Sequence, residues 1–401
     1  MPADAPAAPA AEVAAPIRRP GAWPPAFVAS QADRDALVVL AHLEGMPPAE
    51  LHSLAWREGA ASACLAAVTR GASATPGDRR IAAAVDPGAV RSALARIGAR
   101  VVTPADPEYP ERLLHLPDPP ACLFVRGRRL AVGGESGPAV GIVGARASSA
   151  YGREVAAEIA AGVASAGVAV VSGAARGIDG CAHRGALRAG GPTVAVLGSG
   201  IDVAYPRANR RLIEEIAAAG TVISEYPPGM PPHQRRFPAR NRIVAALARA
   251  VLVVEGAPKS GSLITVEFAT DLGRDVMAVP GPVTSPLSIV PHELIRDGAA
   301  LIRSADDVLA VLGLPPEPGR RALGSGPPAA DASPDERRLL EAIAGGPTTA
   351  DAAARTAGLD PARTLAALVS LELSGAIRAV GGRYERAGRG HGPVPDAPEG
   401  G

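Results

Sequence analysis

The feature that most constrains the fold is a regular alternation of two kinds of segment in the central half of the chain. Short runs rich in β-branched residues recur at Ala139 to Val143, Val168 to Ser172, Thr193 to Leu197, Thr221 to Glu225, Val251 to Glu255 and Val276 to Pro280. Amphipathic segments separate them, at Tyr151 to Ala166, Asn209 to Ala219, Arg242 to Ala250 and Thr265 to Leu272. Buried strands that alternate with crossover helices are typical of parallel sheets. We therefore predict an α/β fold with a doubly wound, mostly parallel sheet.

Segments on either side of this core differ from it in composition. Residues 1–30 are rich in Ala and Pro, and we predict that they are disordered. Residues 31–103 have helical periodicity with Asp or Pro at helix entries, which predicts a small bundle that resembles a sterile-alpha-motif or helix-hairpin-helix module in helix count alone. A Pro/Gly-rich linker over 313–333 precedes three helices and a tight hairpin over 334–387, a pattern typical of a winged helix. Residues 388–401 are predicted to be a disordered tail.

Composition excludes several classes of protein. Basic and acidic residues number 41 and 40, so the net charge of +1 gives no global sign of a nucleic-acid binder. Cys64, Cys122 and Cys181 lie far apart without a CxxC pair, which excludes a disulfide framework or a cysteine zinc site as the organising feature. The N-terminus has no continuous apolar segment, and the longest uncharged stretch is too short and glycine-rich to span a bilayer. We expect a cytoplasmic protein without membrane association.

The loops that follow the predicted strands carry the candidate site. In an open parallel sheet, ligands bind outside the carboxyl ends of the strands. Each of these loops contains glycine, and nearly all contain Arg or Ser, which favours phosphate binding by backbone N–H groups and helix N-termini. Between Tyr205 and Arg249, eight arginines stand against three glutamates. This local positive charge suits an extended polyanion, and Phe237 could stack on an unpaired base.

Simpler interpretations of the same features stay open. Gly144-Ala-Arg146 could be only a tight turn, and the chain has neither a GxGxxG nor a Walker lysine, so dinucleotide or ATP binding has little support. The arginines of 235–242 could form a solvated surface. We expect His183 to cap or pack and not to catalyse. We likewise expect three carboxylates to fix the conformation of the loops and not to act as an acid/base pair, namely Asp179, Glu225 and Glu255.

Taken together, the motifs resemble the DNA-processing protein A family, also called DprA or Smf. The resemblance covers about Pro104 to Leu312 and is carried chiefly by Ile142-Val-Gly-Ala-Arg146, Ser172-Gly-Ala-Ala-Arg-Gly-Ile-Asp179, Phe237-Pro-Ala-Arg-Asn-Arg242 and Ser260-Gly-Ser-Leu-Ile-Thr265. It implies a Rossmann-like domain over 104–312 that binds single-stranded DNA as a homodimer. It further implies loading of the RecA recombinase past single-strand-binding protein during natural transformation. No enzymatic activity, cofactor or metal is implied.

The resemblance also implies the residues of the DNA site, position by position. Those expected to line the groove are Arg146, Arg176, Arg207, Phe237, Arg240, Asn241 and Arg242. Those expected to offer hydrogen-bond donors nearby are Ser172, Gly173, Lys259, Gly261 and Ser262. The chain departs from the family where Ala145 and Ala174 replace a frequent Ser and Leu.

Two other functions fit the same predicted sheet. One is a nucleotide phosphoribohydrolase of the lysine-decarboxylase-like group, although its Pro-Gly-Gly-x-Gly-Thr-x-x-Glu signature is missing and Ser260 to Glu267 keeps Thr and Glu at the wrong spacing. The other is a winged-helix transcription regulator with a ligand-sensing core.

Overall fold

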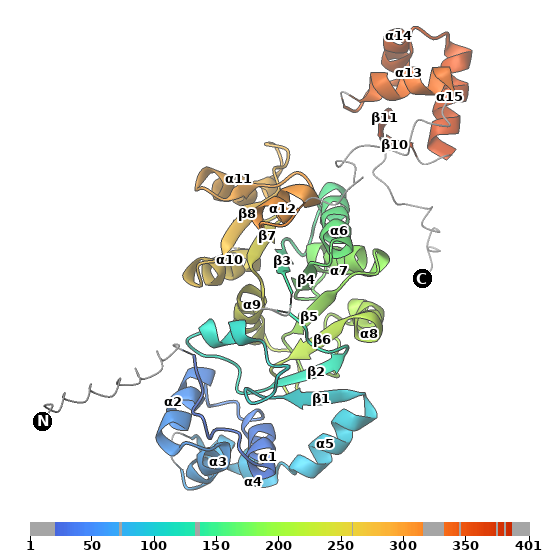
Figure 1. Ribbon diagram of the computed structural model, residues 1–401. Helices are drawn as coiled ribbons and strands as arrows, with labels where there is room; N and C mark the ends of the chain where they lie inside the picture. Colours follow the sequence, from blue (N-terminus) through green and yellow to red (C-terminus); the bar gives the residue numbers. More distant parts are fainter. Residues whose placement is uncertain are drawn as a thin grey trace, which may run out of the picture.

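The computed structural model describes residues 21–71, 74–132, 137–258, 260–315, 333–344, 346–373, 376–380 and 382–386. Its central layer is a nine-stranded sheet in the order β1-β2-β6-β5-β4-β3-β7-β8-β9 (Figure 1). The strands are β1 Ala99–Val102, β2 Leu123–Gly127, β3 Ala139–Val143, β4 Ala169–Ser172, β5 Thr193–Leu197, β6 Thr221–Ser224, β7 Ala250–Val253, β8 Asp275–Ala278 and β9 Ala300–Leu301.

The sheet is mostly parallel, as predicted. Strands β3 to β9 all pair in parallel, whereas β1 and β2 pair antiparallel and extend one edge next to β6. The chain winds outward from β3 in both directions, with β4 on one side and β7 on the other. In a doubly wound sheet, the crevice at this reversal is the usual place for a ligand. The expected ligand site therefore lies at the carboxyl ends of β3, β4 and β7.

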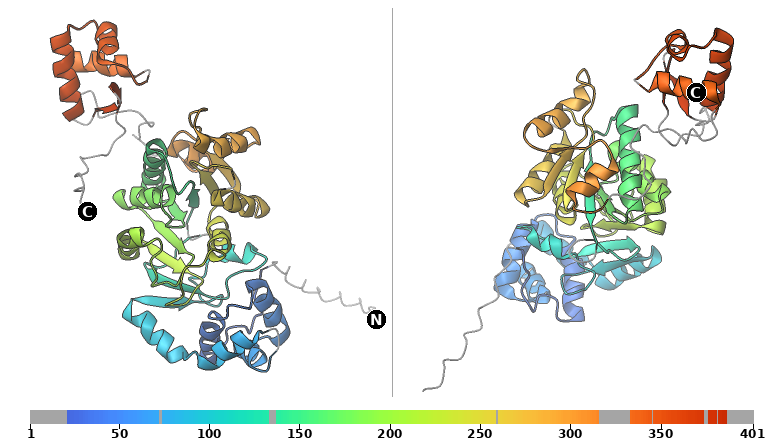
Figure 2. Two further views of the ribbon diagram at one scale, coloured as in Figure 1. Left: turned by 180° about the vertical axis from the view of Figure 1, so that it is seen from behind. Right: turned by 45° about the horizontal axis from the view of Figure 1, so that its top comes forward.

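Helices cover both faces of the sheet (Figure 2). One face packs against α9 (Arg236–Leu247), α10 (Gly261–Asp271) and the short helix η1 (Glu111–His115). The other packs against α6 (Ala150–Ser165), α7 (Ile178–Arg188) and α12 (Ala305–Val311). Side chains alternate between these two cores along each strand, so that Val251 and Val253 face α9 while Leu252 faces α6. The remaining elements of this part are α8 Arg210–Ala219, α11 Ile289–Arg296, η3 Arg207–Asn209 and η4 Pro286–Ser288.

The packed part of the N-terminal region begins before its first helix. Five helices lie between residues 31 and 96, namely α1 Gln31–Leu40, α2 Pro48–Glu58, α3 Ala61–Thr69, α4 Pro76–Ala84 and α5 Pro87–Arg96. Trp23 and Phe27 are buried among them, with ring centroids 4.3 Å apart, and Gly21 N–H donates to the Leu114 carbonyl at 3.1 Å. The predicted disordered tail over 1–30 is therefore too long, because residues 21–30 bury aromatic side chains. Residues 1–20 lie outside the described ranges.

The predicted boundary at residue 103 also shifts. β1 precedes it and pairs with β2 in the nine-stranded sheet, so the sheet begins at residue 99. The apolar core of the N-terminal helices continues onto the sheet through Phe124 and Val222.

The C-terminal elements have the order of a winged helix. Three helices, α13 (Pro334–Ile343), α14 (Ala350–Ala357) and α15 (Pro361–Leu373), precede the hairpin of β10 (Ile377–Val380) and β11 (Arg383–Arg386). They have a core of their own. The predicted linker over 313–333 and tail over 388–401 lie almost wholly outside the described residues. Within the described ranges, no helix combines the length and apolarity needed to cross a bilayer.

Candidate nucleic-acid interface

An exposed arginine and two aromatic rings meet at the carboxyl edge of the sheet. Arg146 follows β3, and its guanidinium carbon lies 5.5 Å from the centroid of the Phe237 ring. Tyr205, from the loop after β5, stacks on the Phe237 ring, with the ring centroids 5.1 Å apart and the ring planes 28° apart. Arg146 and Tyr205 are exposed and Phe237 is half-buried. A cation beside stacked rings offers both a phosphate contact and a platform for a base.

The loop that carries Arg146 is held by backbone contacts. Ala145 N–H donates to the Glu255 carbonyl at 2.8 Å, and the Glu255 carboxylate accepts from Ser149 N–H at 2.9 Å and from its hydroxyl. Gly177 has φ +73° and lies so close to the Ala145 carbonyl that a Cβ there would collide with it. The loop after β4 therefore packs directly on the Arg146 loop, and the arginine projects from a fixed base.

Two further predicted groove arginines are exposed on neighbouring loops. Arg176 follows β4, and Arg207 begins η3 after β5. The buried amide of Asn209 ties these loops together, because its Nδ2 donates to the carbonyls of Ala174 at 3.0 Å and Ala175 at 2.9 Å. Ala174 is the one non-glycine residue with positive φ, +52°, among the described residues. The small side chain at this departure from the family limits the steric cost of that backbone conformation.

The structure buries Arg240, which the resemblance placed in the groove. The residue is 5% exposed, and its Nη1 donates to the Gly173 carbonyl at 2.7 Å and to the Val196 carbonyl. Burial lowers the pKa of Arg240 to about 10, with Asp179 opposing that effect. Asp179 in turn accepts from the N–H groups of Gly173 and Ala175. Arg240 thus ties the loop after β4 to β5, and its guanidinium is not free to contact a nucleic-acid strand.

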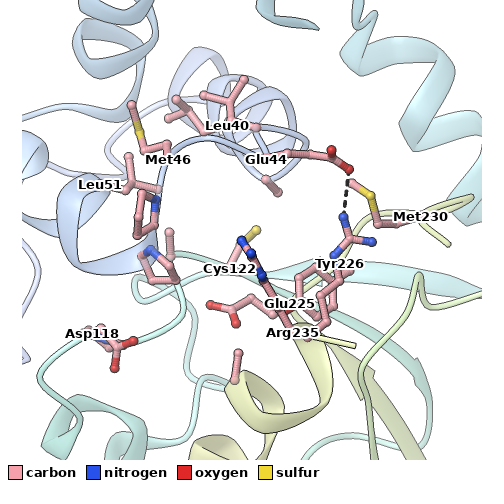
Figure 3. A pocket seen from close by; sticks show the side chains of 18 of the residues that line it. Leu40, Glu44, Met46, Leu51, Asp118, Cys122, Glu225, Tyr226, Met230 and Arg235 are labelled. Carbon is pink, nitrogen blue, oxygen red and sulfur yellow. Dashed lines mark hydrogen bonds and ion pairs between the residues drawn. The ribbon is translucent and has the colours of Figure 1, made fainter. Parts of the chain in front are cut away.

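Arg242 is also an interior residue. Its guanidinium pairs with Glu225 at 2.8 Å and with Asp118 at 3.0 Å, and the residue is 2% exposed. Burial alone would lower the pKa of Arg242, but the two carboxylates raise it above its usual value. All three side chains contribute to the wall of a cavity of about 830 Å³ between the N-terminal helices and α9. Figure 3 shows Asp118 and Glu225 in this wall. Arg242 therefore joins the segments that follow η1 and β6 to α9, and its guanidinium is engaged within the protein.

The predicted donors divide in the same way. Ser172 is fully buried and donates to the Ile142 carbonyl at 2.6 Å, and Ser262 is 7% exposed with its hydroxyl 2.6 Å from that of Ser260. Gly173 is buried against Arg240. Gly261 is exposed, and its carbonyl accepts from Asn241 Nδ2 at 3.1 Å. Lys259 lies outside the described residues.

The groups expected to order the chain do so. His183 is fully buried, with Nδ1 2.7 Å from the Thr193 hydroxyl, and burial lowers its pKa to about 3, assisted by the charge of Arg240. The three carboxylates accept hydrogen bonds from other segments: Asp179 from Gly173 N–H, Glu225 from Arg242 and Glu255 from Ser149 N–H.

Tyr205 is the residue of this edge that sequence reasoning left out of the site. It is 42% exposed and stacks on Phe237. A signal was present, because an aromatic residue after a strand stands out in a chain with 3% aromatics.

These features define a Rossmann-like α/β protein whose carboxyl edge presents exposed arginines around an aromatic pair. Residues 100–313 match the family described as DNA recombination-mediator protein A, and residues 323–383 match the DprA winged helix domain. The chain belongs to this DprA/Smf family, and membership brings a role in DNA processing.

Individual relatives agree with this assignment. Protein Smf of Escherichia coli is 39% identical over 295 residues, which cover 71% of this chain and 77% of that protein. DNA processing protein DprA of Streptococcus pneumoniae is 46% identical over 202 residues, or 50% and 70% of the two chains. The X-ray structure of DprA from Streptococcus pneumoniae superposes with a TM-score of 0.60 at 34% identity, over 70% of this chain and 98% of that one.

Proposed function

We propose that this protein is a non-enzymatic mediator that binds single-stranded DNA at the carboxyl edge of its sheet. In this role it would protect incoming strands and load RecA on them during natural transformation, in the cytoplasm and as a homodimer. Single-strand-binding protein would be displaced or bypassed in the process. Membership of the DNA recombination-mediator family supports this direction.

The observation that carries the proposal is the group formed by Arg146, Phe237 and Tyr205. Its rings are stacked and partly exposed, so an unpaired base can add to the stack, whereas a paired base keeps its faces inside the duplex. Arg146, with Arg176 and Arg207 on the flanking loops, supplies positive charge for the phosphates on either side. The proposed groove therefore keeps Arg146, Arg176, Arg207 and Phe237 of the predicted set and adds Tyr205.

The test is fluorescence anisotropy of the full-length protein with labelled oligo-dT and with a duplex of the same length, across a salt series. We expect a clear preference for the single strand and an affinity that falls as salt rises, because arginine contacts release counterions. Equal or negligible binding to both would overturn the proposal, and release of free base from nucleoside monophosphates would point to a phosphoribohydrolase instead.

A matched pair of variants locates the site. Arg146→Ala is expected to weaken oligo-dT binding, while Arg188→Ala, an exposed arginine at the far end of α7, is expected to leave it unchanged. Equal loss in both variants would mean that binding follows overall charge and not this edge.

A further inference from the structure

A second group of arginines lies at the opposite, amino edge of the same sheet. Arg249 comes directly before β7 and Arg274 directly before β8. These two strands pair in parallel, with Ala250 opposite Asp275, so the two arginines are neighbours across the sheet. We call Arg112, Arg249 and Arg274 the amino-edge cluster.

All three members reach the same face of the sheet. Val251 and Val276 pack in the core beneath α9 and α10, and side chains two residues apart on a strand share a face. Arg249 and Arg274 therefore point toward that face as well. Arg112 comes to it from η1, whose Leu113 is buried in the same core. Nη2 of Arg274 lies 2.9 Å from Nδ1 of His115, also in η1, which fixes the two segments together.

The cluster has positive charge without a carboxylate to balance it. Within the described ranges, no ion pair and no hydrogen bond to a carboxylate involves any of the three arginines. Burial lowers the pKa of Arg112, and Arg274 and Arg249 lower it further. Arg112 Nη1 and Arg274 Nε are buried N–H groups with no hydrogen-bond acceptor among the described residues.

This arrangement is costly unless an anion joins it. Like charges repel more strongly where burial removes water from between them, and a buried N–H without an acceptor loses its hydration energy. The contrast with Arg242 is instructive, because that buried guanidinium has two carboxylates beside it. Forked guanidinium groups match the oxygens of phosphate, which can accept from several of them at once.

We propose that the amino-edge cluster is a binding site for a phosphate oxyanion. The bound phosphate group could belong to a DNA strand that continues around the molecule from the carboxyl edge, or it could be a free phosphate group. The assignment to a DNA strand rests on the proposed function, whereas the binding of phosphate itself does not. The site is separate from the carboxyl edge, because the residues that precede parallel strands and the residues that follow them lie at opposite edges of the sheet.

The first experiment measures thermal unfolding of the full-length protein with inorganic phosphate against chloride at equal ionic strength. At about ten times the Kd, phosphate is expected to raise the Tm of the wild type by about 3 °C. Arg249→Ala with Arg274→Ala should lose this shift, while Arg188→Ala, at an exposed arginine outside both proposed sites, should keep it. Arg249→Ala alone, a change at an exposed side chain, serves if the double variant does not fold.

Stability without phosphate provides a second, independent readout. Removal of a guanidinium from a cluster of like charges relieves repulsion, so the Arg249→Ala chain should unfold at the same temperature as the wild type or higher in chloride. Two results would overturn the proposed site. One is a wild-type Tm that is no higher in phosphate than in chloride, and the other is a phosphate-dependent rise in Tm that persists in the double variant.

The second experiment separates the two sources with oligo-dT of about 6 and about 30 nucleotides, which are short and long against the span of a single binding module. Weaker binding of the long oligomer alone by Arg249→Ala assigns the site to a DNA strand. Unchanged binding of both oligomers, with the phosphate shift present, assigns it to a free phosphate group. Failure of the proposed function would look different, because the wild type would then bind neither oligomer and still respond to phosphate.

Discussion

Arginines of the same predicted groove serve two different purposes at the carboxyl edge and in α9. Arg146, Arg176 and Arg207 stand on loops after strands and are exposed. Arg240 and Arg242 stand on α9, where each is at least 95% buried and engaged with carbonyls or carboxylates of the protein itself. The first group is available to a ligand, and the second sets the position of the loops that the ligand would contact. A motif rich in arginine is therefore not by itself a binding surface.

The largest expected effect that tests this comparison is the loss of Arg242. Arg242→Ala leaves Glu225 and Asp118 without their shared cation, and the release of a buried charge from its partner costs about 3–5 kcal/mol. We expect the free energy of unfolding, measured by urea denaturation, to fall by about that amount. Arg211→Ala, whose side chain is 93% exposed in an i,i+4 pair, should change it by less than about 0.5 kcal/mol. An Arg242→Ala protein with wild-type stability and no affinity for DNA would reverse the assignment.

Phe237 comes next, because it is the part of α9 that does reach the edge. Phe237→Ala removes the stacking platform, and base–aromatic stacking contributes about 1–3 kcal/mol per base. The Kd for oligo-dT should rise by about ten- to a hundredfold in anisotropy titrations. Phe237→Tyr keeps a ring in place and should restore most of the affinity. If the alanine variant binds as tightly as the wild type, the aromatic pair is only a packing feature of the loops.

Arg146 should have a smaller effect with a distinct signature. Arg146→Ala removes a single exposed charge, so we expect about a tenfold loss of affinity, ~1.4 kcal/mol, and a slope of log K against log salt that is less steep by about one. Phe237→Ala should leave that slope unchanged, because it removes no charge. The two variants together distinguish phosphate contacts from stacking. An unchanged slope in Arg146→Ala would remove this residue from the phosphate contacts.

The sheet was predictable from the sequence, and the fate of the α9 arginines was not. Continuous β-branched runs mark buried parallel strands, so β3 and β5 have the predicted bounds. The helix predicted from Arg242 begins at Arg236, because its arginine-rich first turn has no apolar period and contains Pro238, which the first turn of a helix tolerates. Burial of Arg242 depends on Asp118, 124 residues away in sequence, and local patterning carries no information about that pairing.

Site residues show the same division. Arg146 and Phe237 are brought together by the parallel strand order, which the alternating pattern predicts. Ser172 was expected as a donor from its motif, yet the alternation along β4 turns it inward to the Ile142 carbonyl. The amino-edge cluster has no motif at all, since its members are united by the pairing of β7 with β8 and by the docking of η1.

The smallest expected effect comes from a carboxyl group without the pairing that Glu225 has. Burial raises the pKa of Glu158, on α6, to about 7, with the neighbouring Glu154 adding to the shift and Arg188 opposing it. The folded state therefore binds a proton more tightly than the unfolded chain, whose glutamate pKa is 4.5. This contribution to stability is complete below pH 4.5 and is lost as the pH rises through about 7.

Glu158→Gln cannot ionise, so it should be more stable than the wild type at about pH 8 and equal to it at about pH 4. Because the side chain is only partly buried, we expect a difference below about 1 kcal/mol in urea denaturation, and a wild type that is the more stable protein at the higher pH would contradict the raised pKa.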